Sequence, residues 1–144
     1  MKTIEFFNAE RYPDPTAYAA LQAIDKKDRK AINSFVHQPK AWVYICSPYR
    51  GDTKVNIELA KRYSKAVALE GKMPITPHLL YPQFLDDEDD LERALGLHFG
   101  LLLLEKCNEL LCCGEYISEG MRKEIDYAKA KGIRITYTNR KALL

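Results

Sequence analysis

Residues 112–128 read CCGEYISEGMRKEIDYA, and the predicted fold depends on this stretch. The apolar run 110–113 ends at Gly114, which predicts a buried strand followed by a turn. A helical pattern begins near Ser118 and continues past Glu124. A strand, a turn and a helix N-terminus in this order are typical of an open α/β sheet, where ligands bind at the carboxyl ends of the strands.

The loop before this helix carries groups that suit an anionic ligand. The segment from Ser118 to Gly120 offers a hydroxyl and backbone N–H groups, and the helix dipole adds to the attraction. Glu124 lies one turn into the helix, so we predict that its carboxylate lies beside a nucleotide. The plainer alternative is that Ser118 is an ordinary N-cap and Glu124 an acid that complements the helix dipole.

The rest of the chain alternates strands with helices. Strands are expected at 41–46, 73–77, 109–113 and 133–137, and helices at 53–70, 89–106 and 118–131. This order predicts a parallel sheet with right-handed crossovers, which is a small doubly wound, flavodoxin-like or Rossmann-like α/β fold. Leu101 to Leu104 are apolar all round their helix, which predicts that this half is buried.

We place the α/β domain at residues 41–144 and an N-terminal helical extension at residues 1–40. Asp14-Pro15 is a helix-start signal in the extension, and the pattern after it is helical. The apolar residues of the extension could pack on the main domain or on another subunit.

A second loop follows the strand 41–46 and offers Ser47, Tyr49, Arg50 and Gly51, while His78 follows the strand 73–77. If strands 41–46 and 109–113 are neighbours, the crevice at the carboxyl ends brings both loops together. Arg50 could bind a phosphate or carboxylate through two N–H groups. Taken singly, each residue also fits a solvated turn or a loop hydrogen bond. Two such loops at equivalent strand ends favour a ligand site.

Composition argues against several classes of function. With 22 Lys+Arg against 20 Asp+Glu, the net charge of +2 gives no electrostatic case for binding a nucleic acid polymer. The apolar run 95–104 is too short to span a bilayer. Polar residues interrupt the N-terminus and leave no signal-peptide pattern. We therefore expect a cytoplasmic protein that acts on a small molecule.

Cysteines and acidic residues do not form a recognisable metal motif. Cys46, Cys107, Cys112 and Cys113 lack a C-x-x-C pair and are expected to be buried thiols in a reducing compartment. The acidic run 86–90 precedes a helix, so capping and solvation explain it, with Mg²⁺ as a minor alternative. We expect no metal, disulfide or cofactor.

Both loops support a family resemblance. Residues 43–51, VYICSPYRG, and 118–124, SEGMRKE, resemble loops of the nucleoside 2-deoxyribosyltransferase-like superfamily. The chain from Val43 to Ile135 is similar to the deoxynucleoside 5′-monophosphate N-glycosidases and looks closest to a branch of bacterial and phage proteins. In those glycosidases a Ser-x-Arg-Gly loop and a Ser-x-Gly-x-Gly-x-Glu loop hold the 5′-phosphate. The final Glu attacks the anomeric carbon.

The resemblance implies an enzyme that hydrolyses or transfers at an N-glycosidic bond, with helices flanking a sheet and a homodimer or higher oligomer. A non-catalytic nucleotide-binding or sensor module of the same fold is the alternative, and an assembly protein that uses the N-terminal extension is a third. Glu124 is the predicted nucleophile. The residues predicted to bind substrate are Ser47, Tyr49, Arg50, Gly51, His78, Ser118, Gly120 and Met121.

Two positions depart from the family pattern. Arg122 replaces the second glycine of the loop, and Gly100 stands near the place of an Asp that helps to polarise the nucleoside. The missing Asp leaves the acid–base half of the reaction unassigned, with His78, His98 or Asp87 as substitutes. It also favours the non-catalytic alternative.

Overall fold

The computed structural model describes Lys30 and residues 40–138 of the 144-residue chain. Apart from Lys30 and Lys40, the predicted extension of residues 1–40 lies outside the described residues, as does the chain after Thr138. The division into an extension and a domain therefore stays a prediction.

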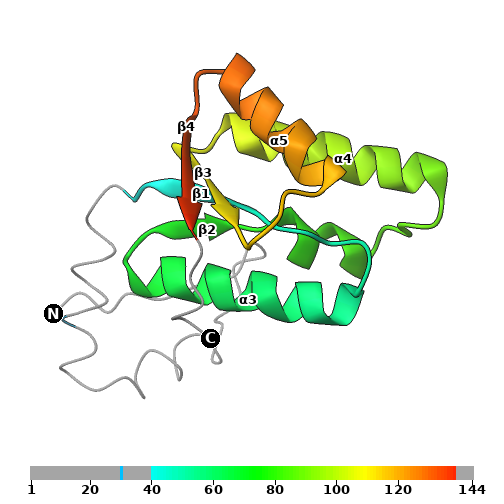
Figure 1. The fold of residues 1–144 in the computed structure, drawn as a ribbon, viewed down its shortest axis with the longest axis horizontal. Helices are drawn as coiled ribbons and strands as arrows, with labels where there is room; N and C mark the ends of the chain where they lie inside the picture. Colours follow the sequence, from blue (N-terminus) through cyan, green and yellow to red (C-terminus); the bar gives the residue numbers. More distant parts are fainter. Residues whose placement is uncertain (1–29, 31–39, 139–144) are drawn as a thin grey trace, which may run out of the picture. The chain divides into compact units, whose positions relative to one another are not determined.

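Within residues 40–138, four parallel strands form one sheet in the order β2-β1-β3-β4. The strands are β1 (Trp42–Cys46), β2 (Met73–Ile75), β3 (Glu109–Cys113) and β4 (Arg134–Thr138). The helices are α3 (Thr53–Leu69), α4 (Asp90–Glu105) and α5 (Glu119–Ala130). Figure 1 shows α3 on one face of the sheet and α4 with α5 on the other. This arrangement confirms the predicted α/β fold class.

Strands β1 and β3 are apolar after their first residues, Trp42 and Glu109, because both of their faces are covered there. Alternate residues point to opposite helix layers. The side packed against α4 and α5 contains Tyr44, Cys46, Leu110 and Cys112, and the side packed against α3 contains Val43, Ile45, Leu111 and Cys113. The four cysteines are buried free thiols.

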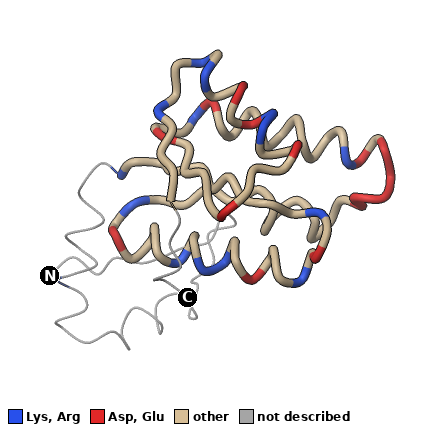
Figure 2. Tube along the Cα trace, viewed as in Figure 1, with Lys and Arg blue, Asp and Glu red and all other residues tan. Residues whose placement is uncertain are grey.

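Short polar side chains start each helix. Asp52 accepts a hydrogen bond from the Val55 N–H at 3.3 Å, and Asp89 accepts one from the Glu92 N–H at 2.9 Å. Asp89 belongs to the acidic run at the turn before α4, which Figure 2 shows in red. Capping therefore explains this member of the run.

Helix α4 departs from its predicted burial. Leu104 is fully buried, but Leu102 is 44% exposed and Leu95 is 39% exposed. The prediction that Leu101 to Leu104 are buried was therefore wrong for part of the helix. Gly96, Gly100 and Leu104 lie on the opposite side of the helix from these exposed leucines. An apolar pattern all round a helix does not reveal which side is left uncovered.

Two 3₁₀ turns occupy part of the segment between the predicted strand 73–77 and the predicted helix 89–106, to which no regular element was assigned. They are η1 (Pro77–Leu79) and η2 (Tyr81–Gln83), each with a proline in its first turn. They carry the chain from β2 towards α4. Among the helices of the described residues, none has the length and apolar character needed to cross a membrane.

Candidate functional site

A cavity lies where the strand order reverses. Strands β1 and β3 are adjacent and parallel, with Cys46 opposite Cys112 at their carboxyl ends. The loops after these strands, together with η1, η2 and α4, line a cavity of about 410 Å³. Position and volume are those expected for a small-molecule site in a doubly wound sheet.

The cavity brings together nearly all of the residues predicted from sequence. Gly51 is absent from its lining, and its φ of 102° instead turns the chain from the Arg50 loop into α3. The predicted residues on the cavity wall are Ser47, Tyr49, Arg50, His78, Ser118, Gly120, Met121 and Glu124.

Glu124 is a buried acid with one bound oxygen. Its Oε1 accepts a hydrogen bond from the Tyr44 hydroxyl at 2.9 Å, and His78 Nε2 lies 3.8 Å from the same oxygen. Its Oε2 is buried and has no hydrogen-bond partner among the described residues. Burial raises the pKa of Glu124 from 4.5 to about 7, against the lowering effect of the nearby Cys46 thiol and Tyr44 hydroxyl. A carboxyl group with this pKa can change its charge near neutral pH.

His78 forms part of the wall beside Glu124. Its ring stacks on Tyr49 with centroids 5.3 Å apart and an angle of 12° between the planes. Burial lowers the pKa of His78 from 6.5, and the Asp87 charge and a hydrogen bond with the Ser47 backbone oppose that effect. The imidazole is therefore mainly neutral at pH 7, so its contact with Glu124 is not a strong ion pair.

Ser47 resembles Glu124 in having an unsatisfied polar atom. The residue is 1% exposed, and its Oγ has no hydrogen-bond partner among the described residues. Buried hydroxyl and carboxylate oxygens are normally paired. Ser47 Oγ and Glu124 Oε2 belong to residues on the same cavity wall, so a ligand with hydroxyl groups could satisfy both.

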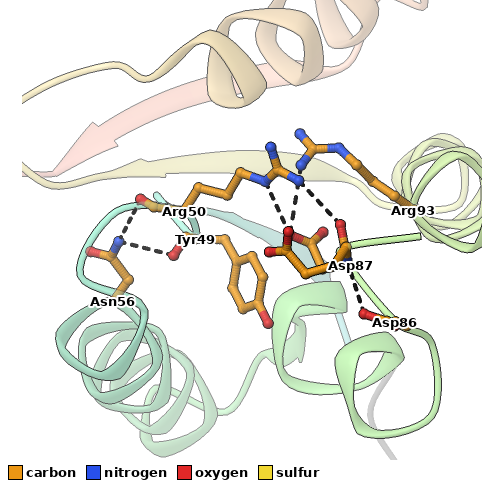
Figure 3. Close-up of polar contacts among 7 residues, drawn as sticks. Tyr49, Arg50, Asn56, Asp86, Asp87 and Arg93 are labelled. Atoms are coloured by element: carbon orange, nitrogen blue, oxygen red, sulfur yellow. Dashed lines mark hydrogen bonds and ion pairs between the residues drawn. The ribbon is translucent and has the colours of Figure 1, made fainter. Parts of the chain in front are cut away.

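Arg50 lies at the rim of the cavity in a network of charges. Its Nε donates to Asp87 Oδ2 at 3.0 Å and its Nη2 donates to the Asp87 carbonyl oxygen at 3.1 Å. Arg93 Nη1 lies 3.6 Å from the same Oδ2, so two guanidinium groups converge on one carboxylate, as Figure 3 shows. The Asn56 amide fixes the loop by donating to the Tyr49 and Arg50 carbonyl oxygens, both at 3.1 Å.

Of the three residues that could replace the missing family Asp in acid–base chemistry, two lie at the cavity and one does not. His78 and Asp87 line the cavity, whereas His98 is exposed on α4 and does not. A Cβ added at Gly100 would lie 3.3 Å from the Tyr44 hydroxyl oxygen. Gly100 therefore leaves room for the hydroxyl group that binds Glu124.

The plainer interpretation of Ser118 also has support. Its Oγ accepts a hydrogen bond from the Met121 N–H at 3.3 Å and so caps α5. Ser118 still lines the cavity. The Arg50 side chain is 56% exposed, as the plainer interpretation expects, but Asp87 also binds it.

Three residues of the site escaped sequence reasoning. Tyr44 reads as a core aromatic in an apolar strand, and Arg93 reads as a charge near a helix start. Asn56 reads as an exposed helix residue but is buried. A hydroxyl inside an apolar strand, two residues before a polar loop, is the one signal that could have identified Tyr44. Among the described residues, no cluster of three or more His, Cys, Asp or Glu could hold a metal ion.

Comparisons with known proteins address the fold. A model of the family described as Domain of unknown function (DUF7768) matches residues 41–138. No curated protein matches the chain. A solved 2-deoxyribosyltransferase from the psychrotolerant bacterium Bacillus psychrosaccharolyticus is similar, with a TM-score of 0.58 and 12% identity over 67% of this chain and 71% of that chain. A conserved protein from Enterococcus faecalis V583 aligns with a TM-score of 0.49 and 18% identity over 71% of this chain and 66% of that chain.

The similarity to the 2-deoxyribosyltransferase supports the predicted fold class. It also supports, at the level of fold, the resemblance seen in the two loops.

Proposed function

We propose that this chain, which belongs to the DUF7768 family, cleaves the N-glycosidic bond of a nucleoside or nucleotide with Glu124 as the nucleophile. The observation that carries the proposal is the setting of Glu124. The acid lies on the wall of a cavity at the carboxyl ends of β1 and β3, with one oxygen bound by Tyr44 and the other unpaired. The fold shared with a 2-deoxyribosyltransferase supports a nucleoside as the substrate.

The proposed reaction has two steps. Ionised Glu124 attacks C1′ through an oxygen, and the bond from C1′ to the base nitrogen breaks with its electron pair leaving on the base. The departing base takes up a proton. Water or a second base then attacks C1′ of the glycosyl-enzyme, releases the Glu124 carboxylate and loses a proton. This is the two-step logic of retaining glycosidases.

Neighbouring side chains have supporting roles in this proposal. The Tyr44 hydroxyl orients the carboxylate, and the Ser47 hydroxyl binds the sugar. Tyr49 contacts the base or the sugar from its stack with His78. His78 Nε2 lies 3.8 Å from Glu124 Oε1, and a protonated imidazole is a common proton donor in catalysis, so we assign to His78 the proton that the departing base takes up.

Base release tests the proposal. Purified protein is incubated with a panel of ribo- and deoxynucleosides and their 5′-monophosphates, and free base is measured by chromatography. We expect release from at least one compound and a loss of at least a hundredfold in Glu124→Gln. Asp126→Asn changes an exposed acid on the same helix and should keep the rate. Equal release by wild type and Glu124→Gln would overturn the role of Glu124.

A second candidate is a non-catalytic module that binds a nucleoside in the same cavity. Gly100 favours it, because glycine brings no carboxylate to the place of the family's Asp. Such a module would be stabilised against heat by a nucleoside without releasing base. Glu124→Ala would leave that stabilisation intact.

We also propose that the protein assembles as a homo-oligomer. Leu91, Leu95 and Leu102 form one stripe along α4 and are 70%, 39% and 44% exposed. Exposed leucines in one stripe are typical of a helix that packs on a partner. A cytoplasmic location fits the four free thiols, which a reducing compartment would preserve.

A further inference from the structure

The family resemblance assigns the Arg50 guanidinium to a 5′-phosphate, but in this chain Asp87 already binds that guanidinium. Asp87 accepts from Arg50 Nε through its carboxylate at 3.0 Å and from Nη2 through its carbonyl at 3.1 Å. A phosphate that used the same N–H groups would have to displace both oxygens. The Asp87 carboxylate also lies 3.6 Å from Arg93 Nη1, so it partly neutralises the second guanidinium at the rim (Figure 3).

The rest of the cavity wall adds no surplus of positive charge. Its basic side chains are Arg50, Arg93 and Lys123. Its acidic side chains are Asp86, Asp87, Glu92, Glu119 and Glu124. A phosphate dianion would therefore meet more carboxylates than cations, and in a partly buried site such repulsion is stronger than in water. A neutral nucleoside avoids this repulsion.

We infer that Asp87 sets the substrate class of the site, so that it takes an uncharged nucleoside in preference to the 5′-monophosphate. The inference rests on the proposed function, because it concerns the ligand of the same cavity. The side chains of Arg50 and Asp87 are 56% and 32% exposed, and an isolated ion pair with this exposure has a small effect on binding. Here two hydrogen bonds to one guanidinium and four further carboxylates act in the same direction.

Isothermal titration of the full chain tests the inference with 2′-deoxynucleosides, their 5′-monophosphates and inorganic phosphate. Wild type should bind a nucleoside at least as tightly as its monophosphate. Asp87→Asn should raise the affinity for the monophosphate relative to that for the nucleoside on the order of tenfold. Adding Arg50→Gln to Asp87→Asn should remove that gain.

Asp86→Asn is the matched control, because it removes the same charge from the same loop without freeing Arg50. Its gain in monophosphate affinity should be clearly smaller than that of Asp87→Asn. Equal gains from the two variants, or a wild type that prefers the monophosphate, would overturn the inference.

Inorganic phosphate separates this inference from the proposed function. If no nucleoside binds to any variant, the proposed function fails, and the phosphate titrations still report on Arg50. Phosphate binding that appears in Asp87→Asn and disappears when Arg50→Gln is added would support the masking of Arg50. No phosphate binding by Asp87→Asn would contradict it.

Discussion

Glu124 combines burial with an incomplete set of partners. A typical surface acid one turn into a helix interacts with the helix dipole and with water. Glu124 is instead 8% exposed, with Tyr44 and His78 around one oxygen. The shift of its pKa from 4.5 to about 7 corresponds to a cost of roughly 3 kcal/mol for holding the charge in the folded state. A structural acid would gain nothing from that cost, which is why its placement indicates chemistry.

This cost makes stability depend on pH. Because the pKa is raised in the folded state, protonated Glu124 contributes stability that is complete below pH 4.5 and is lost as the pH rises towards 7. Glu124→Gln stays neutral throughout. Relative to wild type, the variant should therefore gain roughly 3 kcal/mol between pH 4 and pH 8, as measured by urea denaturation. A difference that does not change with pH would contradict the buried setting of Glu124.

His78 should shape the dependence of rate on pH. The nucleophile must be ionised, which requires a pH near or above 7, whereas His78 is protonated only below its lowered pKa. Wild-type kcat/KM should therefore follow a bell whose maximum lies below pH 7. His78→Asn should react more slowly and lose the fall on the alkaline side. His98→Asn, which changes an exposed histidine outside the cavity, should keep the bell, and an unchanged bell in His78→Asn would exclude the assigned role.

Sequence reasoning reached the loop residues of the site but not their partners. Ser47 precedes Pro48 and Ser118 lies two residues before Gly120, in loops that the chain pattern marks after strand ends, and Glu124 was found from its place one turn into the next helix. Tyr44 and Arg93 lie inside regular elements, where local pattern gives no sign of what a side chain meets across the fold. The contact between Tyr44 and Glu124 joins residues 80 positions apart, and only the sheet order brings them together.

At the scale of elements, the loop between β1 and α3 fixes Arg50. Asn56 holds two carbonyl oxygens of this loop from within α3, and Gly51 turns the chain at a φ of 102°. Since a side chain at this φ is strained, Gly51→Ala should cost about 1–2 kcal/mol of unfolding free energy.

Gly120→Ala is the matched control for Gly51→Ala. Gly120 lies in α5, and a Cβ there would meet its nearest neighbour, Ser118 Oγ, at 4.0 Å. Alanine should therefore be tolerated or slightly stabilising at this position. Chemical denaturation measures both variants, and equal loss of stability in the two would contradict the strained turn at Gly51.

The first and last residues of the helices were predicted from sequence more accurately than the burial of their side chains. Capping residues and glycines mark where helices begin and end, so α3, α4 and α5 lie within a residue or two of their predicted limits. The 3₁₀ turns after β2 have no periodic pattern and were predicted as loop. The exposed side of α4 was also missed, because leucines face both directions on that helix.

At the scale of the molecule, the α4 stripe should determine assembly. We expect wild type to be a dimer or higher oligomer, and we expect Leu95→Asp with Leu102→Asp to be a monomer because two charges would be buried at the contact. Leu69→Asp, at an exposed position on α3, should keep the wild-type mass. Light scattering coupled to size exclusion measures all three, and a monomeric wild type would remove the proposed contact.

The sheet order explains why two loops far apart in sequence form one cavity. Order β2-β1-β3-β4 places the reversal between β1 and β3, so both loops open on the same edge. The alternation of strands and helices predicted a parallel sheet, but it left this order open. The charges around Arg50 could not be counted from sequence, because Asp87 and Arg93 reach it from another part of the chain.

The stereochemistry of cleavage tests the central claim most directly. A 2′-deoxynucleoside is incubated with the protein in buffer that contains methanol, and the methyl glycoside is identified by NMR. Two displacements at C1′, the first by Glu124, predict the β-anomer, which retains the configuration of the substrate. Formation of the α-anomer, or the same yield of β-anomer from Glu124→Gln, would contradict attack by Glu124.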